Sequence, residues 1–140
     1  MGLTRGSHNN KSELLRIAII GFGLVGLRHA EALEKVDGVQ LCAVADPSDE
    51  SLEQASAKAV PHFDQLDKLI EKTSPDGVIL ATPTTLHATH ARLCIDADIP
   101  VLIEKPLAIN AIEGRAIVQH AQAKNVQIMV GHHRRFNPII

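Results

Sequence analysis

The sequence predicts an α/β fold, in which a doubly wound parallel sheet (a Rossmann fold) of about six strands carries helices on both faces. The first observation behind this prediction is that short apolar runs alternate with amphipathic stretches, which is typical of parallel strands joined by crossover helices. The second is a GxGxxG spacing of glycines at positions 21 to 26, between the first apolar run and the first helical stretch.

The expected elements follow that alternation along the whole chain. Strands are expected at residues 16–21, 39–46, 60–63, 77–82, 100–104 and 126–131, and the third of them is short. Helices are expected at residues 24–36, 49–58, 64–73, 86–97 and 110–124. Asn110 can cap the last helix, with Glu113 completing a capping box. Because ligands of such a sheet bind beyond the carboxyl ends of its strands, functional residues should follow each strand.

The glycine loop is suited to bind phosphate. Gly21 permits a tight turn, Gly23 removes a side chain that would hold a pyrophosphate away from the backbone, and Gly26 lets the helix pack closely. The first amides of the helix have no intrahelical partner and lie at the positive end of its dipole, so they favour an anion without a basic side chain. Cofactor contacts are predicted for Gly21, Phe22, Gly23, Leu24, Val25 and Gly26.

Asp46 ends the second expected strand, twenty residues past Gly26. A carboxylate at this place can accept both hydroxyls of an adenosine ribose and repel a 2′-phosphate, which indicates NAD rather than NADP as the cofactor. The alternative is that Asp46, which Pro47 follows, only caps the next helix.

Composition excludes several other classes of function. With 140 residues, 45% of them hydrophobic, the chain fits one domain at residues 16–140 after a polar, loose leader at residues 1–15. A formal net charge of −2 and the lack of Lys/Arg runs argue against binding to nucleic acid or an anionic membrane. The apolar runs are too short to span a bilayer. Cys42 and Cys94 have no metal-ligand spacing, so buried thiols and a cytoplasmic location are expected.

Polar and charged residues gather after the later strands, as the fold class requires. They occur in the segments 81–87, 104–106 and 131–138. Together with the glycine loop, these segments resemble the glucose-fructose oxidoreductase, inositol dehydrogenase and MocA family of nicotinamide-dependent enzymes, over about residues 15–140. The matching parts are GxGxxGxxH from Gly21 to His29, Ala45-Asp46, Thr-Pro-x-x-x-His from Thr82 to His87, Glu104-Lys105-Pro106, and Gly-His-x-Arg-Arg-Phe from Gly131.

The resemblance implies roles for particular residues. Ala81, Thr82, Pro83 and His87 would lie along the cofactor, and Lys105, next to Glu104, would stand between nicotinamide and substrate as the catalytic residue. An ammonium there can hold a substrate hydroxyl and stabilise charge that develops on its oxygen. Of Arg134 and Arg135, one is expected to contact the nicotinamide amide or ribose, with Arg134 taken as the contact, while the other makes structural salt bridges.

Each of these residues also has an alternative role. Lys105 could be a surface residue paired with Glu104, and Glu104 could orient Lys105 or point to solvent. Arg134 and Arg135 could form a solvated basic corner. His87 and His90 are three residues apart, but no third metal ligand is evident, so no metal site is predicted.

Family members continue into a second domain that supplies the substrate pocket and further proton-transfer residues, whereas this sequence ends at Ile140. The expected function is therefore the cofactor half of an enzyme that transfers hydride between NAD and a sugar, cyclitol or related secondary alcohol, with little turnover by this chain alone. Surface exposed by the missing domain favours a homo-oligomer. The alternative is a non-catalytic nucleotide-binding or redox-sensing module.

Overall fold

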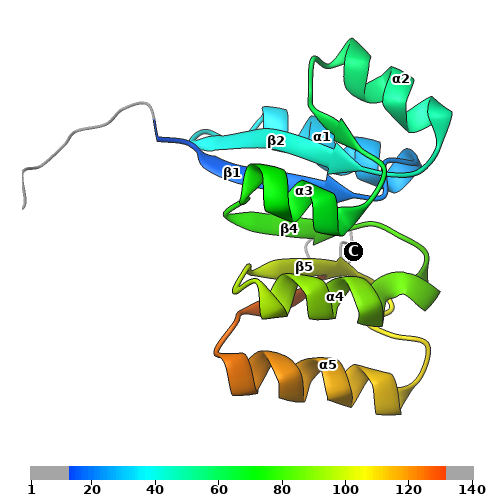
Figure 1. The fold of residues 1–140 in the computed structure, drawn as a ribbon, viewed down its shortest axis with the longest axis vertical. Helices are drawn as coiled ribbons and strands as arrows, with labels where there is room; N and C mark the ends of the chain where they lie inside the picture. The colour runs from blue at the N-terminus through cyan, green and yellow to red at the C-terminus, as the bar shows by residue number, and fades with distance from the viewer. Residues whose placement is uncertain (1–12, 132–140) are drawn as a thin grey trace, which may run out of the picture.

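The computed structural model describes residues 13–131 and contains six strands and five α-helices within them (Figure 1). The strands are β1 (Leu15–Ile20), β2 (Val39–Ala45), β3 (His62–Phe63), β4 (Gly77–Leu80), β5 (Val101–Glu104) and β6 (Ile128–Gly131). The helices are α1 (Leu24–Glu34), α2 (Asp49–Ala57), α3 (Leu66–Thr73), α4 (His87–Asp96) and α5 (Ala111–Lys124), with a short 3-10 turn η1 (Thr84–Leu86) ahead of α4.

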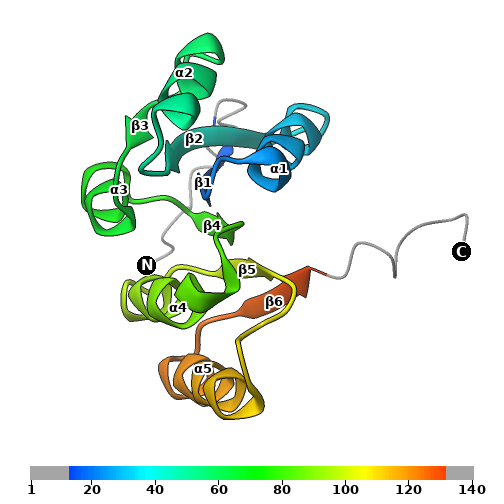
Figure 2. The ribbon, with the colours of Figure 1, turned by 90° about the vertical axis from the view of Figure 1, so that its right-hand side faces the viewer.

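All strand pairs are parallel, and the sheet order is β3-β2-β1-β4-β5-β6. The order reverses between β1 and β4, which makes this the switch point of a doubly wound sheet. Helices α3, α4 and α5 lie together on one face, and α1 lies on the other (Figures 1 and 2). The predicted fold class is confirmed, and the predicted boundaries differ from the observed ones by one or two residues.

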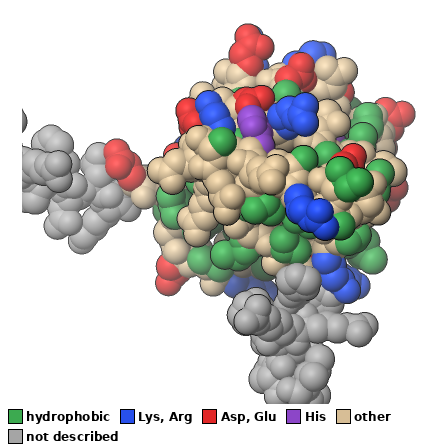
Figure 3. Space-filling model, turned by 90° about the horizontal axis from the view of Figure 1, so that it is seen from below, with side chains coloured by type: hydrophobic (Ala, Val, Ile, Leu, Met, Phe, Trp, Pro, Cys, Tyr) green, Lys and Arg blue, Asp and Glu red, His purple; other side chains and the backbone are tan. Residues whose placement is uncertain are grey.

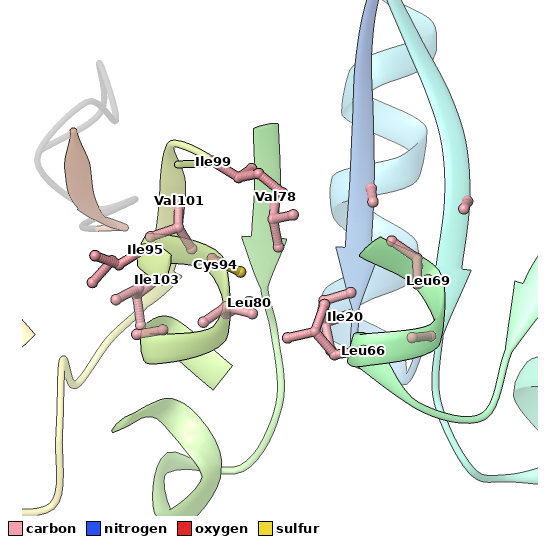
Figure 4. Close-up of a cluster of buried hydrophobic side chains, with 14 of the residues drawn as sticks. Ile20, Leu66, Leu69, Val78, Leu80, Cys94, Ile95, Ile99, Val101 and Ile103 are labelled. Atoms are coloured by element: carbon pink, nitrogen blue, oxygen red, sulfur yellow. The ribbon is translucent and has the colours of Figure 1, made fainter. Parts of the chain in front are cut away.

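Alternating side chains divide the core into two layers, one on each side of the sheet. Ala18 and Ile20 of β1 point into the larger layer, which also holds Leu69 of α3 and Ile95 of α4 (Figure 4). Ile19 points into the smaller layer with side chains from α1 and α2. The central strands are apolar at nearly every position because both of their faces are covered.

The helix ends agree in part with the predicted capping. Asn110 caps α5, because its Oδ1 accepts a hydrogen bond from the Glu113 amide at 2.9 Å. The return bond of a capping box does not form among the described residues, where Glu113 Oε2 is buried without a partner. Cys42 and Cys94 are buried free thiols, as predicted. Burial raises the pKa of Cys94 to about 12.

The surface of the described residues is mixed in charge. On the face seen in Figure 3, Lys and Arg side chains are spread among hydrophobic and acidic ones. No helix within residues 13–131 is long and apolar enough to cross a membrane.

Candidate functional site

A wide hollow among the described residues lies at the carboxyl edge of the sheet, at its switch point. It has a volume of about 820 Å³ and is lined from the ends of β1, β2 and β4 and from the starts of α3 and α4. Six of the predicted site residues line it: Gly21, Gly23, Asp46, Ala81, Thr82 and Pro83. A ligand site at this place is what the strand order of the sheet leads us to expect.

The glycine loop takes the shape that its spacing predicted. Gly21 has a φ of 87°, which is the left-handed region that favours glycine, and a Cβ there would lie 2.5 Å from the carbonyl oxygen of Ala81. A Cβ on Gly26 would clash with the carbonyl oxygen of Gly21. A Cβ on Gly23 would meet no heavy atom within 4 Å. The close packing of the fold therefore explains glycine at positions 21 and 26, whereas Gly23 leaves an open space in front of the loop.

The amides at the start of α1 face this open space without a capping side chain. Gly23 is the N-cap residue, and its carbonyl oxygen accepts a hydrogen bond from the Leu27 amide at 2.9 Å. Among the described residues, no acceptor is bonded to the amides of Leu24, Val25 and Gly26. No acidic residue occupies the first turn to neutralise the helix dipole. The loop thus presents hydrogen-bond donors and a partial positive charge to the hollow.

Phe22 has a different place from its neighbours in the loop. Its side chain is 2% exposed and belongs to the smaller core layer, and its amide donates to Asp46 Oδ2 at 2.8 Å. Phe22 therefore anchors the loop and does not line the hollow. The side chains of Leu24 and Val25, in contrast, are 67% and 43% exposed at the start of α1.

Asp46 lies at the end of β2 and joins the loop to the hollow. Its two oxygens accept hydrogen bonds from the amides of Phe22 and Ser48, each at 2.8 Å. Desolvation alone would raise the pKa of Asp46, but these amides and hydrogen bonds from Ser48 and Ser51 lower it below 3.8, so the carboxylate is held ionised. Ser48 caps α2, because its Oγ accepts from the Ser51 amide at 3.2 Å. Asp46 is thus not the helix cap.

Several lining residues were not predicted from the sequence. Asp64, Gln65, Leu66 and Asp67 come from the end of β3 and the start of α3, and Leu86, Thr89, His90 and Leu93 come from η1 and α4. The rule that functional residues follow strands would have found the first group, but the strand before it has two residues and gives a weak pattern. Burial first, and then the nearby His87, lower the pKa of His90, so this ring is held neutral.

His87, which is predicted to lie along the cofactor, is not among the residues that line the hollow. Its side chain is 1% exposed, and its ring nitrogens Nδ1 and Nε2 each lie 2.9 Å from a backbone carbonyl oxygen, those of Pro106 and Thr82 respectively. The ring therefore contacts the backbone of both loops, the one after β4 and the one after β5. His87 is the first residue of α4 and is buried. His90 lies about one turn later on the same helix and lines the hollow.

Glu104 and Lys105 also depart from the alternatives considered for them. Glu104 neither pairs with Lys105 nor points to solvent, because its Oε1 lies 2.6 Å from Nε2 of His29 on α1. His29 is thus a packed, hydrogen-bonded histidine. Lys105 is exposed, and its side chain has no hydrogen bond or ion pair within residues 13–131. Arg134 and Arg135 lie outside the described residues.

No group of three or more His, Cys, Asp or Glu side chains in the described part of the chain could hold a metal ion. The hollow is lined by the glycine loop and by the carboxylates of Asp46, Asp64 and Asp67, and the exposed Lys105 follows β5 at the same edge of the sheet.

Comparison with known proteins gives a consistent result. The model of a family described as "Oxidoreductase family, NAD-binding Rossmann fold" matches residues 15–132. The 4-carboxy-2-hydroxymuconate-6-semialdehyde dehydrogenase of Sphingobium sp. is 35% identical over 126 residues, which are 89% of this chain and 40% of the relative. Inositol 2-dehydrogenase 1 of Saccharopolyspora erythraea is 35% identical over 130 residues, 89% of this chain and 38% of the relative.

A solved structure of WlbA dehydrogenase from Bordetella pertussis, in complex with NADH and UDP-GlcNAcA, superposes with a TM-score of 0.84 at 27% identity, over 89% of this chain and 39% of that one. The chain thus spans about two fifths of the length of the curated relatives it matches. By sequence match and by fold, it belongs to the glucose-fructose oxidoreductase, inositol dehydrogenase and MocA family, as an NAD-binding Rossmann domain.

Proposed function

We propose that NAD binds in the hollow at the switch point, with its diphosphate on the amides at the start of α1. The observation that carries this proposal is the open space at Gly23, where a Cβ would meet nothing within 4 Å although Gly21 and Gly26 are tightly enclosed. The fold has no use for that space, whereas a diphosphate bound to backbone amides requires it. Asp46, held ionised beside the loop, is placed to accept the adenosine ribose hydroxyls.

The other predicted site residues are assigned in the same way. The residues proposed to hold the cofactor are Gly21, Phe22, Gly23, Leu24, Val25, Gly26, Asp46, Ala81, Thr82, Pro83, His87, Glu104, Lys105 and Arg134. Phe22, His87 and Glu104 take part through the segments that they anchor. Arg134 remains a sequence-based proposal, because it lies outside the described residues.

A preference for NAD over NADP forms part of the proposal. Within residues 13–131, the charged side chains that line the hollow include three carboxylates, from Asp46, Asp64 and Asp67, and no Lys or Arg. A 2′-phosphate would therefore meet negative charge without a cation to balance it. NADPH should bind more weakly than NADH.

The reaction we propose is hydride transfer between NAD and a sugar, cyclitol or related secondary alcohol. Bound nicotinamide supplies the hydride acceptor or donor. Lys105 follows β5 on the same edge of the sheet, and its ammonium is free to hold the substrate oxygen and to stabilise charge that develops on it. A redox-sensing module would need a nucleotide site but no cation beside the nicotinamide. The exposed Lys105 therefore favours the hypothesis of an enzyme over that of a sensor.

Titration of the chain with NADH and with NADPH, followed by cofactor fluorescence, tests the binding part of this proposal. We expect saturable binding of both, with the lower dissociation constant for NADH. Tighter binding of NADPH would contradict the role given to Asp46. The catalytic part is tested by turnover of a panel of polyols by the full-length protein and its Lys105→Ala variant. Turnover that is unchanged in the variant would remove Lys105 from the reaction.

A further inference from the structure

Lys105 lies at a bend of the chain, and its own side chain makes no hydrogen bond or ion pair within residues 13–131 that would stabilise this bend. It lies between the last residue of β5 and Pro106, it is exposed, and its side chain bonds to no residue in the described range. Its two neighbours in the chain are each bonded by a histidine. These histidines come from helices on opposite faces of the sheet, His29 from α1 and His87 from α4.

The contact of His29 fixes the residue before Lys105. Nε2 of His29 is 2.6 Å from Oε1 of Glu104, and the two side chains are 23% and 18% exposed. Gly131 of β6 closes the other side, since a Cβ there would lie 3.3 Å from the same Oε1. The carboxylate is thereby confined between α1 and β6. Because Glu104 is bonded to His29, it does not fold back onto the ammonium of Lys105.

The contacts of His87 fix the residue after Lys105. Nδ1 faces the carbonyl oxygen of Pro106 and Nε2 faces that of Thr82, both at 2.9 Å, and the ring is 1% exposed. A carbonyl oxygen only accepts hydrogen bonds, so a ring nitrogen of His87 that carries a hydrogen donates to the carbonyl that it faces. The ring thus joins the loop after β4, which lines the hollow at Thr82, to the loop that carries Lys105.

We propose that His29 and His87 are positioning residues that hold the Lys105 loop from both faces of the sheet, His29 through Glu104 and His87 through the carbonyl oxygens of Pro106 and Thr82. This inference rests on the proposed function, because it concerns the place that Lys105 takes beside bound nicotinamide. Neither histidine contacts the reacting atoms. Together they keep the ammonium unpaired and at a constant distance from the nucleotide site, which is the condition for hydride transfer at a fixed geometry.

The first test uses the 140-residue chain, NADH, and ADP-ribose, which lacks the nicotinamide ring. Trinitrobenzenesulfonate labels exposed lysines, and mass spectrometry of the Lys105 peptide gives the labelling rate. We expect NADH to protect Lys105 more than ADP-ribose does. In His29→Gln this protection should fall roughly three- to ten-fold, as the loss of one charge-assisted hydrogen bond allows, with ADP-ribose affinity unchanged.

The matched control is His120→Gln, which makes the same substitution in a histidine bonded to a carboxylate elsewhere, with Nε2 2.7 Å from Asp96. It should leave the protection of Lys105 as it is. If NADH protects Lys105 equally in His29→Gln and in the unmodified chain, the positioning role is wrong. If the unmodified chain binds neither NADH nor ADP-ribose, the proposed function fails instead, and the second test still decides the histidine contacts.

The second test measures the ring hydrogens of His87 directly. In the unmodified chain labelled with nitrogen-15 and carbon-13, with signals assigned through bonds, we expect a ring N–H of His87 to exchange with water far more slowly than the ring N–H of His120, because the His87 ring is 1% exposed between two carbonyl oxygens. A ring N–H of His87 that exchanges as fast as that of His120 would overturn the bridge between the two loops. Because the comparison is made within the unmodified chain, it does not depend on whether a buried variant folds.

Discussion

Gly23 and Gly26 belong to one sequence motif, but their surroundings are opposite. An added Cβ on Gly26 would run into the backbone of Gly21, whereas an added Cβ on Gly23 would enter open space. The packing of the fold therefore favours glycine at position 26 and does not require it at position 23. A residue that the fold does not need, at a loop with unpaired amides, is best explained by a ligand that approaches the backbone closely.

This contrast leads to a paired prediction. Gly26→Ala should lower the free energy of unfolding by about 1–3 kcal/mol through overpacking. Gly23→Ala should lower it by less than about 1 kcal/mol. In the second variant, NADH affinity should nevertheless fall roughly ten-fold or more, because the methyl group displaces the diphosphate from the amides. Urea unfolding and NADH fluorescence measure the two quantities. Full NADH affinity in Gly23→Ala would place the diphosphate elsewhere.

Asp46 gives a prediction on pH. Its pKa in the folded chain is held below its ordinary value of 3.8. Its ionised form therefore stabilises the fold above that pH, and the contribution is lost as the pH falls through the folded-state pKa. Asp46→Asn should be less stable than the unmodified chain near neutral pH, and the difference should shrink on acidification below about pH 4. Urea unfolding of both proteins at a series of pH values measures this, and a difference that stays constant with pH would contradict it.

At the level of elements, the residue two positions after the end of α2 has a backbone conformation that is unfavourable for alanine. Ala59 follows this helix with a φ of 55°, in the left-handed region that glycine tolerates best. Two residues earlier, Ala57 is the last residue of the helix itself. The same substitution should therefore have opposite effects at these two positions.

Ala59→Gly should raise the free energy of unfolding by about 0.5–1 kcal/mol, because glycine adopts a positive φ without steric cost. Ala57→Gly should lower it by a similar amount, about 0.5–1 kcal/mol, because glycine weakens a helix. Both variants lie far along the chain from the glycine loop, and thermal unfolding compares them. A decrease in stability for Ala59→Gly would show that its conformation carries no penalty.

The elements of this fold could be predicted because each is encoded by residues close together in sequence. The apolar runs of β1 and β4, the loop glycines and the acid after β2 are local patterns, and the structure contains all of them. The contacts of His29 and His87 could not be predicted, because they join residues 75 and 19 positions apart. The same histidine pattern is compatible with a buried support or with a ligand contact, and only packing distinguishes them.

At the level of the whole molecule, the two faces of the sheet are covered unequally within the described residues. Helices α3, α4 and α5 cover one face, and α1 lies on the other (Figure 2). On the side of α1, a hollow of about 360 Å³ is lined from β4, β5 and β6 and by Leu33 of α1. Gln127 is the one polar side chain among the residues that line it, and Met129 there is 56% exposed. Apolar surface of this kind favours self-association.

We therefore expect the isolated chain to self-associate as its concentration rises, which sedimentation velocity can measure. Met129→Lys should weaken this association roughly ten-fold or more, since burying a methionine side chain contributes about 1.5–3 kcal/mol. Ile112→Lys is the matched control, because Ile112 is 78% exposed on α5, on the opposite face. A chain that stays monomeric at high concentration would rule out the expected homo-oligomer.

The pairing of β1 with β4 determines when the nucleotide site can exist during protein synthesis. Ile17 of β1 lies opposite Gly77, so the central strand receives its second neighbour only after sixty further residues have been made. A nascent chain that ends at β3 already contains the glycines and Asp46, but not the wall formed by Ala81, Thr82 and Pro83. On a translating ribosome, NAD can therefore assist folding only after β4 has left the exit tunnel.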